Sequence, residues 1–116
     1  MTDPKDWPKN RQLWTTALRD PERKQTTGKL GHQDHGGQCC LGVLAEIAGC
    51  EYRNGLWNGE KTDVSSRAMD FVGLRGSTGD YFGSSLVKDN DRHRKTFVEI
   101  ADIIEEEPEG LFREAI

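Results

Sequence analysis

Apolar residues recur with helical spacing near the start of the chain. Four of them fall at positions i, i+1, i+4 and i+5, which places them on one face of a helix. We expect this helix to begin at about Asn10 and to end before Pro21, because the residue that precedes a proline avoids the helical conformation. Its apolar face is predicted to consist of Leu13, Trp14, Ala17 and Leu18.

A second apolar block is the strongest local pattern in the chain. Glu46 is its one charged residue, and Gly49 stands where a glycine commonly ends a helix. A helix that is apolar on most sides is usually buried in the centre of a domain. We therefore predict a core helix over residues 39–48, packed through Cys40, Leu41, Val43, Leu44, Ile47 and Ala48.

Shorter elements are expected around this core helix. Residues 24–30, the segment through Gln38 and residues 84–88 are typical of short strands. Asn54-Gly55 indicates a hairpin turn, because both turn positions require positive φ angles.

Two more helices are predicted in the second half of the chain. The first is expected to be capped by Asp63 and ended by Gly73, with an apolar face of Val64, Ala68, Phe71 and Val72. Residues 89–91 are expected to lead into the second, which residues 105–108 would stop. Its inner stripe would be Phe97, Ile100, Ala101 and Ile104.

These elements predict an α+β fold with one small domain, which suits a chain of 116 residues. Residues 1–9 would be a polar lead-in and residues 10–116 the domain. We expect three to four helices around a buried central helix, packed on short antiparallel hairpins. The predicted core is Leu13, Trp14, Ala17, Leu18, Cys40, Leu41, Val43, Leu44, Ile47, Phe71, Leu74, Phe97, Ile100 and Ile104.

Three sequence blocks follow one another in a recognisable order. They are Trp-x-x-Ala-Leu-Arg from Trp14, Cys-Cys-Leu-Gly-Val-Leu from Cys39 and Phe-x-x-Ile-Ala-x-x-Ile from Phe97. In this order the chain resembles a group of small uncharacterised proteins carried by bacteriophages and prophages, over most of residues 14–105. The resemblance implies a viral origin and expression inside an infected cell. It brings no established activity, so no functional residue follows from it.

Charge and composition narrow the classes of partner. The formal net charge is −4 and the sequence pI is about 5.4, so nucleic-acid binding is not favoured. No stretch approaches the roughly 18 apolar residues of a membrane span, and the first residues lack the apolar core of a secretory signal. We expect a protein of the host-cell cytoplasm, with no membrane contact and no cofactor, whose three cysteines are free and buried.

A metal site and a cysteine nucleophile are the chemical alternatives near the core helix. His32, His35 and Cys39 have ligand types that zinc accepts, but Cys39 and Cys40 would point about 100° apart on a helix, so no metal is expected. A thiol of Cys39 or Cys40 at a helix start could act as the nucleophile of a hydrolase. His93 or His35 would be the base, with Asp89, Asn90 or Asp91 orienting His93.

A glycine-rich segment over residues 73–83 is a candidate ligand site. Glycines let backbone N–H groups approach an anion, and aromatic rings can stack on a base. The segment lacks the Gly-Lys-Ser/Thr ending of a P-loop, so the predicted ligand is only broadly nucleotide-like. The candidate ligand-binding residues are Arg75, Ser77, Thr78, Tyr81 and Phe82.

An acidic cluster near the end of the last helix is a candidate surface for a basic partner. It consists of Asp102, Glu105, Glu106, Glu107 and Glu109, and a solvated helix end is the alternative interpretation.

Trp7 is expected to fold back over the core. An apolar face on the predicted hairpin could serve either the core or a dimer contact, so a homodimer remains open. The favoured function is a non-enzymatic accessory protein that binds a host protein or a small ligand and counters host defence.

Overall fold

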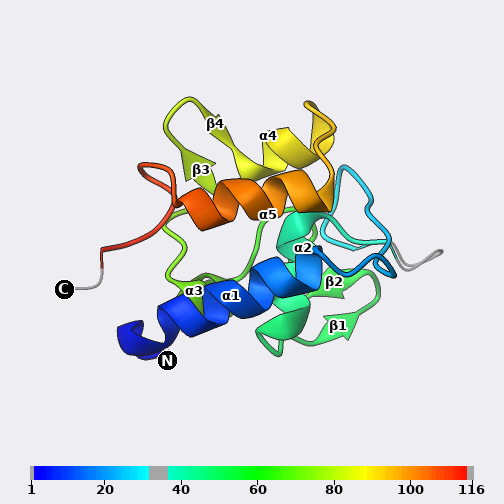
Figure 1. Ribbon diagram of the computed structural model, residues 1–116. Coiled ribbons are helices and arrows are strands. Elements are labelled where there is room, and N and C mark those ends of the chain that lie inside the picture. Colours follow the sequence, from blue (N-terminus) through cyan, green and yellow to red (C-terminus); the bar gives the residue numbers. More distant parts are fainter. Residues whose placement is uncertain (1, 32–36, 115–116) are drawn as a thin grey trace.

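The computed structural model describes residues 2–31 and 37–114. Within these residues it contains five α-helices, one short 3-10 helix and two hairpins, arranged around one core (Figure 1). The predicted α+β fold is therefore confirmed. The elements are η1 (Pro4–Asp6), α1 (Trp7–Leu18), α2 (Cys40–Ile47), β1 (Tyr52–Arg53), β2 (Leu56–Trp57), α3 (Ser66–Val72), β3 (Asp80–Tyr81), β4 (Ser84–Ser85), α4 (Leu86–Asp91) and α5 (Phe97–Glu106).

Helix α2 is the buried centre of the domain, as its apolar composition predicts. It packs against α1, α4 and β2. Leu41 and Leu44 are completely buried, and the Trp14 indole N–H donates to the Cys40 carbonyl at 3.0 Å. This bond gives the one polar atom of a buried indole a partner, so the large ring can lie in the core without leaving a donor unpaired.

Helices α1 and α5 run antiparallel and side by side in front of α2 in Figure 1. Arg11 on α1 pairs with Glu107 just beyond α5, and Arg19 after α1 pairs with Asp102 within α5. The prediction that Leu13 lies in the core is wrong: it is 48% exposed, because α1 turns Trp14 and Leu18 inward instead. Ala17, Ile47 and Phe71 are only partly buried at the edge of the core.

Helix α1 starts at Trp7, three residues earlier than predicted, so Trp7 to Lys9 belong to the helix and not to a lead-in. Trp7 is 6% exposed, which confirms that it folds back over the core. Its indole N–H donates to the Asp70 carbonyl at 2.9 Å. Gly73 has a φ angle of 72° and lies directly beneath the Trp7 ring, where a Cβ atom would be 2.5 Å from a ring carbon. Only glycine combines this left-handed conformation with this close approach.

The last carbonyls of α3 are satisfied by side chains of α1. Trp7, Asn10 and Arg11 donate in turn to the carbonyls of residues 70, 71 and 72, at 2.9, 2.7 and 2.8 Å. Carbonyls at a helix end have no partner within the helix, so these bonds both cap α3 and fix α1 against it.

The two hairpins are short and differ in how well the sequence predicts them. Asn54 and Gly55 have φ angles of 55° and 81° and connect β1 to β2, as predicted. The predicted strand over residues 84–88 is wrong beyond Ser85, because Ser85 caps α4 by accepting from the Lys88 N–H. The predicted strand over residues 24–30 is also absent from the described part of the chain, where Gln25 and Gln38 form only an isolated bridge.

Two predicted helix starts are displaced for the same reason. Ser65, and not Asp63, caps α3 through its side chain. Thr96 caps α5 with a reciprocal bond to Glu99, while residues 89–91 form part of α4. In each case a hydroxyl residue at the correct spacing provides the cap.

Candidate functional site

A buried carboxylate organises the region between β3 and α4. The Asp89 side chain is 1% exposed and accepts hydrogen bonds from the Tyr81 and Ser84 hydroxyls, the latter at 3.2 Å. Its Oδ1 atom also lies 2.9 Å from Nδ1 of His93, one helical turn later. Burial, together with the bond to Asp89, raises the pKa of Tyr81 to about 12. Asp89 therefore fixes the β3–β4 hairpin to α4.

Phe82 stands at the tip of this fixed hairpin. Its side chain is 86% exposed, far more than any other large apolar side chain described. The Phe82 N–H donates to the Glu109 carbonyl at 2.9 Å, so a second segment of the chain holds the tip. An apolar ring exposed on a braced backbone loses little conformational freedom when it enters a partner's pocket.

The other predicted ligand-binding residues do not form an anion site. The Ser77 hydroxyl lies 3.2 Å from Asp63 Oδ2, and the Thr78 hydroxyl donates to Asp80 Oδ1 at 2.7 Å. Tyr81 donates to Asp89. All three hydroxyls are therefore occupied by carboxylates, whose charge would repel a phosphate group. Arg75 and Phe82 keep exposed side chains.

The cysteines named as candidate nucleophiles are interior groups. Burial raises the pKa of the Cys39 thiol to about 11, and burial also raises the pKa of the Cys40 thiol well above its ordinary value. The Cys40 sulfur lies 3.7 Å from the Leu86 carbonyl, while the bond of His93 is to Asp89. A thiolate is the reactive form of cysteine, and this environment suppresses it.

The metal alternative falls largely on residues that the structure does not describe. His32 and His35 lie outside the described residues, and Cys39 is buried. Within residues 2–31 and 37–114, no group of three or more His, Cys, Asp or Glu side chains is placed to hold an ion.

Residues 8–78 match the protein family described as Domain of unknown function (DUF8296), which covers more than half of the chain. The chain belongs to this family. Neither a curated protein nor a solved structure matches the chain. The DUF8296 match includes α2, α3 and all of α1 except Trp7, whereas Phe82, α4 and α5 lie beyond its end.

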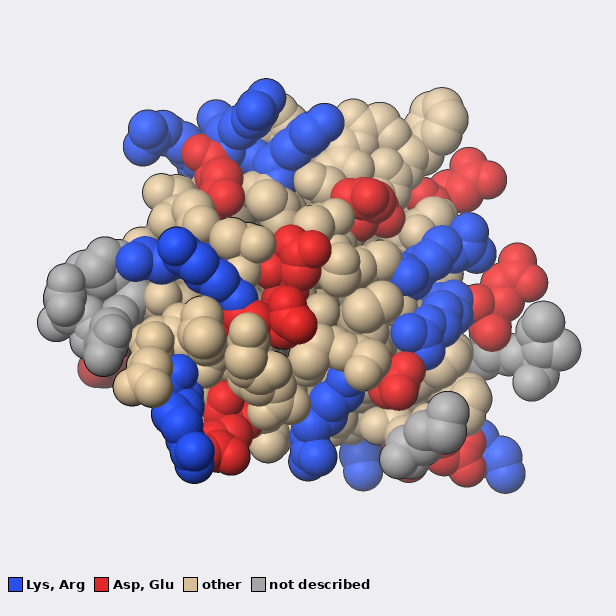
Figure 2. Space-filling view, turned by 180° about the vertical axis from the view of Figure 1, so that it is seen from behind, with Lys and Arg blue, Asp and Glu red and all other residues tan. Residues whose placement is uncertain are grey.

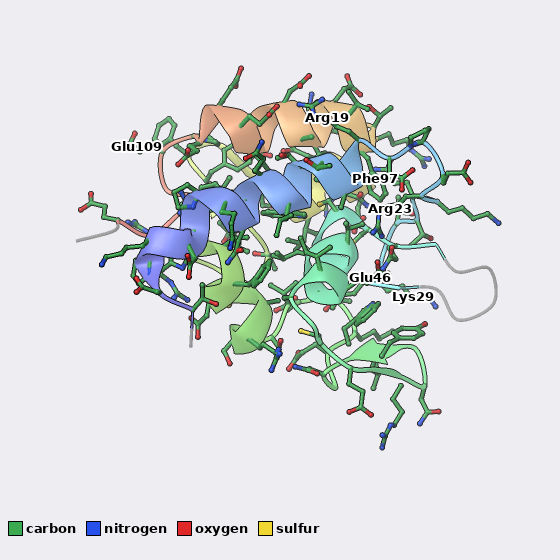
Figure 3. The ribbon with its side chains drawn as sticks, turned by 60° about the horizontal axis from the view of Figure 1, so that its bottom comes forward. Arg19, Arg23, Lys29, Glu46, Phe97 and Glu109 are labelled. Atoms are coloured by element: carbon green, nitrogen blue, oxygen red, sulfur yellow. The ribbon has the colours of Figure 1, made fainter. Side chains whose placement is uncertain are left out.

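Part of the acidic cluster of this DUF8296 protein is neutralised by arginine side chains of the same chain. Arg19 bonds to both Asp102 and Glu105, and Arg11 pairs with Glu107. Glu106 and Glu109 make no ion pair among the described residues. Figure 3 shows Arg19 directed toward α5, with Glu109 beyond the end of α5 that is farther from Phe97. Three of the five predicted contact residues are thus engaged within the fold.

Asn90, which the sequence indicates only as one of three residues that could orient His93, has a structural role instead, because Asp89 makes the contact to His93. It is 1% exposed, and its Oδ1 atom accepts from the Cys40 N–H at 3.3 Å and from the Gln25 amide at 2.9 Å. Its own amide donates to the Thr26 carbonyl at 2.8 Å. A polar residue on a short polar helix gives no periodic signal of burial, because its partners are distant in sequence.

No helix within the described ranges is long and apolar enough to cross a lipid bilayer.

Proposed function

We propose that this DUF8296 protein is a non-enzymatic, phage-encoded accessory protein that binds a host protein in the host cytoplasm and so counters host defence. The contact is made by the tip of the β3–β4 hairpin, with Phe82 as its anchor. The observation that carries the proposal is the 86% exposure of Phe82 on a backbone held by Asp89 and by the Glu109 carbonyl. Aromatic side chains are enriched among the residues that dominate binding energy at protein interfaces.

Two further observations support a protein partner over a small anionic ligand or a hydrolase. The hydroxyls of the glycine-rich segment already bond to Asp63, Asp80 and Asp89, so few donors are left for a phosphate. The thiols of Cys39 and Cys40 are buried with raised pKa values, which opposes nucleophilic chemistry. The phage origin in the proposal is supported by the sequence blocks that begin at Trp14, Cys39 and Phe97.

The test compares Phe82→Ser with Val98→Ser. Val98 is 48% exposed on the outer face of α5, so the control removes a different exposed apolar side chain. Each tagged protein is used to capture proteins from a bacterial host lysate, and captured proteins are quantified by mass spectrometry. We expect a host protein that is enriched by the wild type and by Val98→Ser and is lost with Phe82→Ser.

Equal capture by both variants would show that the hairpin tip is not the contact. If no host protein is enriched over an unrelated tagged domain, the binding function itself is wrong.

A further inference from the structure

Four cationic side chains gather on α4 and its connection to α5. Lys88, Arg92 and Arg94 are exposed and Lys95 is half-buried, and we call these four residues the basic surface. Figure 2 shows Lys and Arg side chains gathered over α4 at the upper left of that view, with one Asp or Glu side chain among them. None of the four makes an ion pair with a described residue, whereas Arg11, Arg19, Arg23, Arg53 and Arg113 all do.

The two carboxylates within the same segment accept hydrogen bonds from neighbouring side chains. Asp89 is buried and bonds to Tyr81, Ser84 and His93. Asp91 accepts a hydrogen bond from the Asn90 amide at 2.8 Å. The segment therefore presents four cations and one partly exposed carboxylate, Asp91, so its net charge is positive although the whole chain carries a formal charge of −4.

The backbone beneath the basic surface is fixed by interior contacts. The N–H groups of Arg92 and His93 donate to the Lys88 carbonyl at 2.8 and 2.9 Å, and the Lys95 N–H donates to the Asp89 carbonyl at 2.9 Å. The Gln25 amide donates to the Lys95 carbonyl at 2.8 Å. A partner would thus meet four cations on a preformed backbone and would not need to order a loop.

The dipole of α5 adds to this charge separation. The basic surface ends at Lys95, immediately before the positive end of the helix, and Glu105 to Glu107 stand at its negative end. Both groups have the sign that a helix dipole disfavours, so this arrangement does not stabilise α5. Glu99 is the one acidic residue in the first turn of α5, so the four cations leave this end of the helix with a net positive charge.

We propose that the basic surface docks on an acidic region of the partner protein, rich in Asp and Glu side chains. This proposal rests on the proposed function and specifies the chemistry of its partner. A compact acidic region complements four cations, whereas the formal charge of −4 on the whole chain disfavours a long polyanion such as a nucleic acid. The partner is therefore inferred to be a protein.

A defined acidic peptide tests the basic surface without knowledge of the partner. The full chain is titrated with a fluorescent poly-glutamate peptide of about 20 residues and, separately, with a single-stranded oligonucleotide of similar length and charge. Arg92→Glu/Arg94→Glu reverses two charges on the surface. Lys5→Glu/Lys9→Glu makes the same net change at exposed positions on η1 and α1.

We expect peptide binding to weaken at least about tenfold in Arg92→Glu/Arg94→Glu and to change less than about twofold in the control. Equal weakening in both would show that only net charge matters and would overturn the proposal. Tighter binding of the oligonucleotide than of the peptide, lost in Arg92→Glu/Arg94→Glu, would overturn it in favour of nucleic acid.

Phe82→Ser separates this proposal from the proposed function. We expect this variant to bind the peptide as the wild type does, because Phe82 lies at the hairpin tip and not in the basic surface. Normal peptide binding, together with unchanged host-protein capture by Phe82→Ser, would refute the hairpin contact and leave the basic surface standing.

Discussion

The Cα atom of Gly42 lies against the carbonyl group of Leu30, so closely that a Cβ atom built on Gly42 would be 1.8 Å from the carbonyl oxygen. That same carbonyl accepts the N–H of Cys39 at 3.2 Å, just before α2 begins. The absence of a side chain at residue 42 therefore allows the segment at Leu30 to pack directly on the central helix. This contact gives a physical role to the glycine in the Cys-Cys-Leu-Gly-Val-Leu block.

Gly42→Ala is predicted to destabilise the domain by about 2–4 kcal/mol, because the added methyl group must displace a backbone segment. Urea unfolding followed by circular dichroism measures the loss. Gly76→Ala is the matched control, since no atom lies within 4 Å of a Cβ atom built there. Similar midpoints for the two variants would contradict the close approach at Gly42.

Leu44→Asp is predicted to unfold the domain, whereas Leu13→Asp is predicted to change its stability by less than about 0.5 kcal/mol. Leu44 is completely buried in α2, while Leu13 is 48% exposed on α1. An unpaired carboxylate at the first site would lose its hydration, and at the second it would keep it. Thermal melting curves of both variants test this, and a folded Leu44→Asp protein would refute the position of α2.

Tyr81→Phe is predicted to lower stability by about 1–2 kcal/mol at neutral pH, because it removes a hydrogen bond to the buried carboxylate of Asp89. The folded-state pKa of Tyr81 is about 12, above its ordinary value of 10.0. The wild type therefore keeps this stabilisation below pH 10 and loses it as the pH rises toward 12. Urea midpoints across that range should converge for the two proteins. Tyr52→Phe serves as a control. A difference in urea midpoint between wild type and Tyr81→Phe that stays constant at all pH values would contradict the dependence of stability on Tyr81 ionisation.

Cys39 and Cys40 are predicted to resist alkylation in the folded protein. A thiol whose pKa is about 11 holds very little thiolate near neutral pH, and both sulfurs are also buried. Iodoacetamide labelling at neutral pH, followed by peptide mass spectrometry, should be slow in buffer and fast in urea. Rapid labelling of either cysteine in the folded protein would revive the hydrolase alternative.

Apolar periodicity predicted most of the helices but not the elements that depend on polar contacts. It located α1, α2, α3 and α5, and Asn54-Gly55 located the first hairpin. It missed α4, because this helix carries one completely buried apolar residue, Leu86, and is held mainly by Asp89 and Asn90. The partners of Asn90 include Gln25, Thr26 and Cys40, which are distant in sequence, so no local pattern reports them.

The candidate site was only partly predictable for a related reason. Residue types indicated that Ser77 and Thr78 could donate hydrogen bonds, and both do. The ring of Tyr81 indicated stacking on a base, and the Tyr81 hydroxyl instead donates to Asp89. The acceptors are carboxylates of the chain itself, and the sequence does not reveal that choice. The exposure of Phe82 likewise depends on the direction of a hairpin, which composition alone does not determine.

The capping of α3 by Trp7, Asn10 and Arg11 has a consequence for the order of events during synthesis. The donors and acceptors are separated by 61 to 63 residues. The N-terminal helix thus leaves the ribosome well before the carbonyls that it serves, and its buried indole has no place to dock until residue 73 has followed. The nascent chain should gain protease resistance late and in one step, as non-local contacts close together.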